Sequence, residues 1–515
     1  MLNRSLETTI EEKDETPVQN NQSYGQILKS TSLVGGSQVI NILLRIIRTK
    51  FLAVLLGPSG IGLMGLYIAV TGIVGTMTSM GIGTSGVRQI AEAAGTGDTQ
   101  KIARTIITLR RSSLFLGFLG MLLTIIVCVP LSRLTFGSAE YAWPIALLSV
   151  TLFLGAVSGG QTALIQGMRR IADLATLSVL GVLLGTVISI PMIFMWGKEG
   201  IVPFLITVSA MTILTSWWYA RKIQVEQIML GWRETIREAK GLLSLGLVFM
   251  TTGLMTTAVM YLIQVLVVRQ LGMDYVGLYL SATTLSSLYI GVILGAMGMD
   301  FYPRLTAVAA DNEACNRMVN EQTEVGLLIA APGILATLTF APLIIQIFYS
   351  ASFIPAYEVL RWQIMGIFLR VVSWPMGYVL LAKGKGKLFF WTEFAGNTVH
   401  ISLVWIGISY FGLEGVGIAF FALYVFYTML IFAVVNYVSN FKWSSAGLRV
   451  IGLASVGVAL AFLIPRFTTQ NIALVCGTIL TLLSIAYALH TLYHLVGPAW
   501  FVDFRNKLKT RLGWK

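Results

Sequence analysis

Apolar stretches long enough to cross a membrane recur along almost the whole chain. Of 515 residues, 56% are hydrophobic and only 11% are charged, whereas ordinary soluble domains carry about 25% charged residues. A transmembrane helix needs about 20 apolar residues. The sequence therefore predicts an all-α polytopic membrane protein with about 14 transmembrane helices. The expected spans are 29–56, 61–85, 107–130, 142–167, 174–196, 201–220, 241–268, 276–300, 325–349, 356–381, 388–411, 415–438, 448–465 and 471–496.

The distribution of lysine and arginine predicts the orientation of the spans. An even number of spans places both termini on the same side of the membrane. With that side cytoplasmic, 27 of the 36 Lys and Arg residues lie in the inner segments or at the inner ends of spans, four lie outside and five lie deeper within spans. Cytoplasmic loops carry the excess of these residues, so both termini are expected in the cytoplasm. The net charge of +13 then follows from topology and requires no nucleic-acid partner.

Residues in the first half of the sequence match residues in the second half at one constant offset in residue number, which is the offset from Gly57 to Gly272. We call it the repeat offset. It spans six helices, so both halves enter the membrane in the same direction. Parallel repeats of this kind occur in transporters whose lobes move around a shared site. We therefore expect two six-helix lobes around a central cavity, with two extra C-terminal helices outside the repeat. The matches are LGPSGIGLMGLY (56–67) with LGMDYVGLY (271–279), GKEGIV (197–202) with GLEGVG (412–417), QGMRRI (166–171) with LAKGKG (381–386), and Gly181 with Gly396.

The repeat and the polar segments between spans predict the division of the chain. The first residues are polar and rather acidic, which predicts a disordered tail and no cleavable signal peptide. The expected parts are a cytoplasmic tail (1–28), an N-lobe (29–223), a cytoplasmic linker (224–240), a C-lobe (241–440), two added helices (441–496) and a basic cytoplasmic tail (497–515).

Motifs of catalysis and metal binding are absent from the sequence. There is no P-loop pattern, so no ATP-driven engine is built into the chain. The three histidines and three cysteines lack metal-ligand spacing, and no span holds a pair of carboxylates. We expect a protein that is not an enzyme, with no catalytic residues, no metal site and no cofactor. The sequence leaves open whether a proton or a sodium ion couples transport.

Three cations interrupt the first apolar span. Arg45 and Arg48 are about one helical turn apart and share a face, whereas Lys50 points elsewhere. A cation deep in a membrane helix needs a cavity, a partner or a route to water. We favour a water-filled, substrate-binding cavity for the two arginines over a structural ion pair. Lys50 either joins that cavity or extends toward the outer membrane surface.

Two further arginines lie in the tenth span. Arg370, near its middle, either lines the cavity or pairs with Glu393 of the eleventh span, so both residues are candidates for substrate binding. Arg361 follows Glu358 by three residues near the outer end. That spacing is typical of a structural ion pair on one helix.

Three stretches of the sequence carry a family likeness: RTKFLAVLLGPSGIGLMGLY (48–67), FYPRLTAVAAD (301–311) and LRWQIMGIFLRVVSWPMGYVLLAKGKGKLFFWTE (360–393). Through them the sequence resembles the Wzx-type O-antigen and oligosaccharide flippases of the MOP superfamily over about residues 30–440, with the greatest likeness to the enterobacterial common antigen flippase. The superfamily also contains the lipid II flippase, whose first helix has an arginine aligned with Arg48, and the MATE drug antiporters. In the last stretch the family pattern falls on Trp362, Gln363, Arg370, Gly377, Tyr378, Ala382, Lys383 and Glu393.

This resemblance implies a function and partners. Such flippases move an undecaprenyl-diphosphate-linked oligosaccharide across the bacterial inner membrane by alternating access. The implied partners are the lipid-linked oligosaccharide, membrane lipids, and a polysaccharide polymerase with its chain-length regulator. The repeat unit (O-antigen, exopolysaccharide or common antigen) stays open. The alternatives are a MATE-type multidrug antiporter, a lipid II flippase and a non-transporting scaffold.

Overall fold

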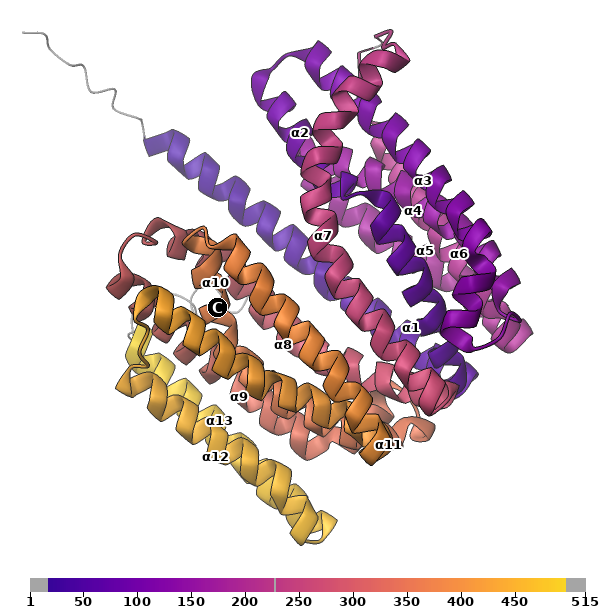
Figure 1. Ribbon diagram of the computed structural model, residues 1–515. Coiled ribbons are helices and arrows are strands. Elements are labelled where there is room, and N and C mark those ends of the chain that lie inside the picture. The colour runs from indigo at the N-terminus through magenta and orange to yellow at the C-terminus, as the bar shows by residue number, and fades with distance from the viewer. Residues whose placement is uncertain (1–16, 227, 497–515) are drawn as a thin grey trace, which may run out of the picture.

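The computed structural model describes residues 17–226 and 228–496, and every regular element in this part of the chain is a helix (Figure 1). Helices satisfy their own backbone hydrogen bonds, as a lipid environment requires. The elements are α1 (Pro17–Ser79), α2 (Ile82–Thr96), α3 (Thr99–Phe136), α4 (Ala142–Gly167), α5 (Ile171–Trp196), η1 (Gly197–Gly200), α6 (Ile201–Ala220), α7 (Trp232–Gln270), α8 (Met273–Ala307), α9 (Asn312–Phe348), η2 (Ala351–Ala356), α10 (Tyr357–Ala382), α11 (Gly386–Ser439), α12 (Ser445–Phe467) and α13 (Gln470–Val496).

The described helices supply the expected number of membrane crossings. Ten helical stretches are long and apolar enough to cross a membrane, and the bent helix α8 adds an eleventh. Three of the ten, Ser37–Ser79, Ile171–Ala220 and Gly386–Ser439, are 43, 50 and 54 residues long, about twice the length of one crossing. Each of these three has a glycine with non-helical angles near its middle, at Gly57, Gly197 or Gly412, and is long enough to cross twice; counted so, the eleven stretches reach the 14 crossings that the sequence predicts.

Glycines with a positive φ angle make the bends, and they pair across the repeat. Gly57 has φ 65° and ψ −172°, and its counterpart Gly272 has φ 106° and ψ 178°. Gly197 has φ 55° and ψ −128°, and its counterpart Gly412 has φ 57° and ψ −135°. Residues with a Cβ rarely adopt such angles, so these positions require glycine in both halves.

The basic turns of the repeat also match in structure. Arg169, between α4 and α5, and Gly384, between α10 and α11, both have a positive φ, of 55° and 69°. The turn around Arg169 has the same three backbone hydrogen bonds as the turn around Gly384, each displaced by the repeat offset. An arginine therefore occupies a backbone conformation that suits glycine.

Two groups of helices, the N-lobe (α1–α6) and the C-lobe (α7–α11), follow from this repeat. We call the end with the bends at Gly57, Gly197, Gly272 and Gly412 the glycine end, and the opposite end the basic end. Helices α2–α6 and α8–α11 meet at the glycine end and separate toward the basic end (Figure 1).

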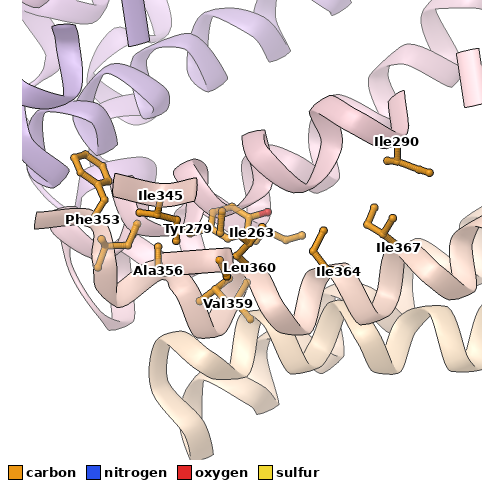
Figure 2. Packing of buried hydrophobic residues seen from close by; sticks show 14 of the residues in the cluster. Ile263, Tyr279, Ile290, Ile345, Phe353, Ala356, Val359, Leu360, Ile364 and Ile367 are labelled. Atoms are coloured by element: carbon orange, nitrogen blue, oxygen red, sulfur yellow. The ribbon is translucent and has the colours of Figure 1, made fainter. Parts of the chain in front are cut away.

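Helix α7 belongs to the C-lobe by the repeat but also packs against the N-lobe. Near the basic end it contacts the N-lobe, where Thr108 Oγ1 donates to Glu238 at 3.1 Å. A Cβ added at Gly81 would lie 2.2 Å from the carbonyl oxygen of Gly246. Near the glycine end, Ile263 of α7 joins the C-lobe core, which Figure 2 shows with residues of α8, α9, η2 and α10.

Two boundaries differ from those that the sequence predicts. The second span, expected to reach residue 85, ends at Ser79, because Met80 and Gly81 both have left-handed φ angles and two such residues end an α-helix. Part of the expected tail, from Pro17 onward, is the start of α1, and proline is preorganised for the first helical position. Residues 1–16 and the tail 497–515 lie outside the described residues.

Helices α12 and α13 lie beside the C-lobe on its far side from the N-lobe (Figure 1). They pack against α9: a Cβ added at Gly477 would lie 2.4 Å from Thr339 Oγ1. The Asn320 side chain of α9 also donates to the carbonyl oxygen of Lys442, at 3.0 Å. The two helices thus add to the repeat without entering either lobe, as the sequence predicts.

Candidate functional site

One face of α1 carries three polar side chains through the apolar span. Asn41, Arg45 and Arg48 follow one another at helical spacing. Asn41 is only 3% exposed, and its Nδ2 donates to Ser178 Oγ of α5 at 2.9 Å. This bond orients the polar face of α1 toward α5.

The opposite face of α1 is apolar and exposed, as lipid contact would require. It consists of Val39, Leu43, Ile47, Phe51 and Val54. The polar and apolar residues of the first span thus separate onto two faces, which explains how an arginine-bearing helix can cross a membrane.

The polar face of α1 lines a cavity of about 570 Å³, which we call the N-lobe cavity. Arg45 and Arg48 are its charged residues, and none of the described residues that line it is acidic. Neither guanidinium has an ion-pair partner within 4.0 Å in the described part of the chain. The cavity is therefore positively charged and suited to an anion. The remaining lining residues are Ser37, Gln38, Thr162, Leu174, Ala175, Leu177, Ser178, Gly181, Val182, Val208 and Thr212.

Lys50 does not line this cavity. Its Nζ donates to the carbonyl oxygen of Gln346, in the last turn of α9, at 2.6 Å. Lysine commonly satisfies the free carbonyls at the C-terminal end of a helix. In this structure Lys50 therefore joins the two lobes near the glycine end.

Arg370 and Glu393 line a second cavity, of about 300 Å³, which we call the C-lobe cavity. Glu393 Oε1 accepts a hydrogen bond from Tyr427 Oη at 2.5 Å. The Arg370 guanidinium has no acidic partner within 4.0 Å among the described residues, so of the two alternatives for Arg370 the pair with Glu393 is not formed here. The other lining residues are Ser373, Trp374, Gly377, Tyr378, Leu381, Phe389, Gly396, Asn397, Leu423, Tyr424 and Tyr427.

A neighbouring cavity opens on the other side of α10. Arg370, Trp374 and Tyr378 line it together with Gly291 and Gly295 of α8, in a volume of about 570 Å³. A Cβ at either glycine would meet no atom within 4 Å. These three α10 side chains therefore separate two open volumes of the C-lobe.

Arg361 has the structural role that the sequence predicts. It is 3% exposed, and its Nη1 donates to Glu358 at 3.4 Å. It also donates to the carbonyl oxygen of Phe462 and lies over that aromatic ring, 4.7 Å from its centroid. The side chain thereby fastens α12 to α10 and is not part of either cavity.

The N-lobe and C-lobe cavities occupy equivalent places in the repeat. Seven residues that line the first cavity correspond, through the repeat offset, to seven that line the second. The pairs are Thr162 and Gly377, Leu174 and Phe389, Ser178 and Glu393, Gly181 and Gly396, Val182 and Asn397, Val208 and Leu423, and Thr212 and Tyr427.

The structure therefore divides the five predicted site residues among three places. Arg45 and Arg48 share one cavity, Arg370 and Glu393 share the other, and Lys50 lies outside both. The sequence reasoning missed Asn41, Asn397 and Tyr427. Applying the repeat offset to the residues beside Gly181 and Gly396 would have pointed to Asn397.

Comparison with known proteins identifies the family. Residues 51–358 match the model of the family described as "Polysaccharide biosynthesis protein". The chain belongs to this family. The five site residues lie outside the matched segment.

Curated relatives are distant in sequence, but the match covers nearly their whole length. Lipid III flippases of Escherichia coli (strain K12) and of Shigella flexneri are each 22% identical over 412 residues, which cover 78% of this chain and 97% of the relative.

Solved structures share the fold. The lipid II flippase MurJ, in an inward closed conformation, has a TM-score of 0.67 at 12% identity and covers 91% of this chain and 99% of its own. An inward-facing multidrug resistance MATE family transporter of the MOP superfamily has a TM-score of 0.62 at 19% identity, over 78% and 94% of the two chains. These matches confirm the predicted MOP fold of a multi-pass membrane protein.

Proposed function

We propose that this protein is a flippase that moves an undecaprenyl-diphosphate-linked oligosaccharide from the cytoplasmic to the periplasmic leaflet by alternating access of its two lobes. Membership of a polysaccharide biosynthesis family and likeness to lipid III flippases support this function.

The N-lobe cavity carries the proposal. Two arginines without acidic partners, at mid-depth in a membrane helix, are unfavourable unless water or an anion surrounds them. A diphosphate supplies such an anion, and guanidinium groups bind phosphate oxygens through paired hydrogen bonds. The exposed apolar face of the same helix allows the polyprenyl tail to stay in the bilayer.

The orientation and assembly belong to the same proposal. The basic end would face the cytoplasm with both termini, the membrane would be the bacterial inner membrane, and the parts would divide at the residues expected from the sequence. Arg370 and Glu393 would contact the head group within the C-lobe. A polysaccharide polymerase and its chain-length regulator would receive the product.

Deletion of the gene tests this function. A strain without the protein should accumulate undecaprenyl-diphosphate-linked glycan on the cytoplasmic side and lose surface polysaccharide, and the wild-type gene should restore both. Accumulated lipid II would instead indicate a lipid II flippase. Normal glycan export combined with sensitivity to cationic drugs would replace the proposal with MATE-type drug export.

A further inference from the structure

The linings of the two equivalent cavities carry different chemical groups at three corresponding positions. Glu393 occupies the place of Ser178, Asn397 that of Val182, and Tyr427 that of Thr212. The C-lobe cavity therefore contains a carboxylate, an amide and a phenol where the N-lobe cavity has small hydroxyls and an aliphatic side chain. This difference in lining predicts that the two cavities bind different chemical groups.

The charges of the two cavities differ as well. Arg45 and Arg48 give the N-lobe cavity two positive charges without an acid, whereas Arg370 and Glu393 give the C-lobe cavity one charge of each sign. The first arrangement favours an anion. The second favours a neutral polar group, because each charge opposes the binding of a like-charged ion.

The C-lobe cavity is lined by a group that only accepts hydrogen bonds, a group that only donates them and a group that does both. Glu393 accepts, and its Oε1 is held by Tyr427. Arg370 only donates, and the amide of Asn397 does both. A hydroxyl group both donates and accepts, so a set of adjacent hydroxyls, as on a sugar ring, matches this combination.

Aromatic side chains complete the wall of the C-lobe cavity. Trp374 and Tyr378 form a ring pair with centroids 4.6 Å apart, and Tyr424 and Tyr427 form another at 6.2 Å. Phe389 lies at the position of Leu174. Aromatic faces carry partial negative charge and attract polarised C–H groups, which a sugar ring presents on its faces.

We propose that the C-lobe cavity binds one sugar residue of the lipid-linked head group, while the N-lobe cavity binds the diphosphate. This division rests on the proposed flippase function and assigns the recognition of the sugar to Glu393, Asn397 and the neighbouring aromatic residues. The volume of about 300 Å³ lies at the small end of ligand pockets, which suits one sugar and not the whole head group.

The test measures binding to the full-length protein in lipid nanodiscs. The probes are undecaprenyl diphosphate alone and the same lipid carrying glucose, galactose, N-acetylglucosamine or N-acetylgalactosamine. Two added hydrogen bonds would raise the affinity for at least one sugar-bearing probe by roughly tenfold over the bare lipid. Asn397→Val, which introduces the residue of the N-lobe, should reduce that affinity to the level of the bare lipid.

Matched variants separate recognition from folding. Thr398→Val changes the next, exposed position of α11 and should retain the full preference for the sugar. Glu393→Gln is isosteric and should lose most of the preference without lowering the thermal unfolding midpoint. Arg48→Ala should weaken the binding of every probe.

Three outcomes would overturn the proposal. If the wild-type protein binds the bare lipid and no sugar raises its affinity, the sugar site is refuted while the flippase function stands. If no probe binds at all, the diphosphate site fails too. If Glu393→Gln keeps the sugar preference but abolishes a pH or sodium dependence of transport, the C-lobe cavity is a coupling site.

Discussion

Gly62 and Gly277, which are equivalent positions of the repeat, pack against each other where the two lobes meet. A Cβ added at Gly62 would lie 2.3 Å from the carbonyl oxygen of Met273, and one added at Gly277 would lie 1.9 Å from that of Pro58. Pro58 and Met273 are themselves related by the repeat offset. The contact is therefore nearly symmetric, and it joins α1 to α8 at the glycine end.

Replacing Gly277 by alanine should push the lobes apart at the glycine end. The new methyl group would meet backbone, which cannot yield by a side-chain rotation, so we expect a loss of about 1–3 kcal/mol in the stability of this closed contact. Spin labels on the exposed residues Glu140 and Ser352 would report a longer distance. Gly452→Ala, at a site with no atom within 4 Å, is the control, and an unchanged distance in Gly277→Ala would contradict this expectation.

Arg48→Ala should abolish glycan export while the protein stays folded and inserted, since removal of a deep charge lowers the cost of insertion. Arg48→Lys should restore export only in part, because an ammonium group keeps the charge without the paired hydrogen bonds. Export in cells and the unfolding midpoint in detergent are measured for the same variants. Lys50→Ala should be milder, and normal export by the double variant Arg45→Ala/Arg48→Ala would rule out the cationic cavity.

Arg361→Ala should destabilise the protein without a specific effect on transport. It leaves the half-buried Glu358 without its partner, and breaking a buried ion pair costs about 3–5 kcal/mol. The unfolding midpoint should fall, while export per folded molecule stays near that of the wild type. Arg88→Ala breaks an exposed pair with Glu92 and should cost about 0–1 kcal/mol; an equal effect of the two variants would refute the structural role of Arg361.

Arg169→Gly should stabilise the protein, by about 1 kcal/mol, because it relieves a left-handed arginine. Arg169→Ala removes the same charge without this relief and is the matched control. In the equivalent turn, Gly384→Ala should lower stability by a similar amount. Unfolding midpoints in detergent measure all three, and equal values for the glycine and alanine variants at 169 would show that φ strain is not the cause.

Cysteine labelling tests the orientation. In a background without Cys128, Cys315 and Cys476, single cysteines at Lys101 and Lys385 should be shielded from an impermeant reagent added outside intact cells. Cysteines at Glu140, Lys198 and Thr468 should react; all five positions are exposed. The reverse pattern would invert the proposed direction of transport.

The fold was largely predictable from the sequence because its determinants are local or periodic. The length of the apolar stretches predicts the membrane crossings. The glycines at 57, 197, 272 and 412 reveal the repeat, because glycine is the residue that readily adopts their backbone angles. The left-handed angle of Met80 was not predictable, since only the neighbouring Gly81 is of a residue type that favours such an angle.

The grouping of the site residues was less predictable. Charge and depth single out Arg48 and Arg370, but their separation into two cavities depends on which helices surround each one. Asn397 and Tyr427 carry no signal as single residues in apolar spans. They are recognised as lining residues of a distinct cavity only when they are compared with Val182 and Thr212, to which the repeat relates them.

The bends at Gly57, Gly197 and Gly412 have a practical consequence. Each joins two crossings with almost no connecting loop, so the glycine end offers little extended polypeptide to a protease, an antibody or a phage. Inserted tags are tolerated in exposed, weakly packed connections. The connection at Gly97 and Asp98 between α2 and α3, at the basic end, is exposed and provides one, and the bends provide none, so a reporter fused within the chain belongs at the basic end.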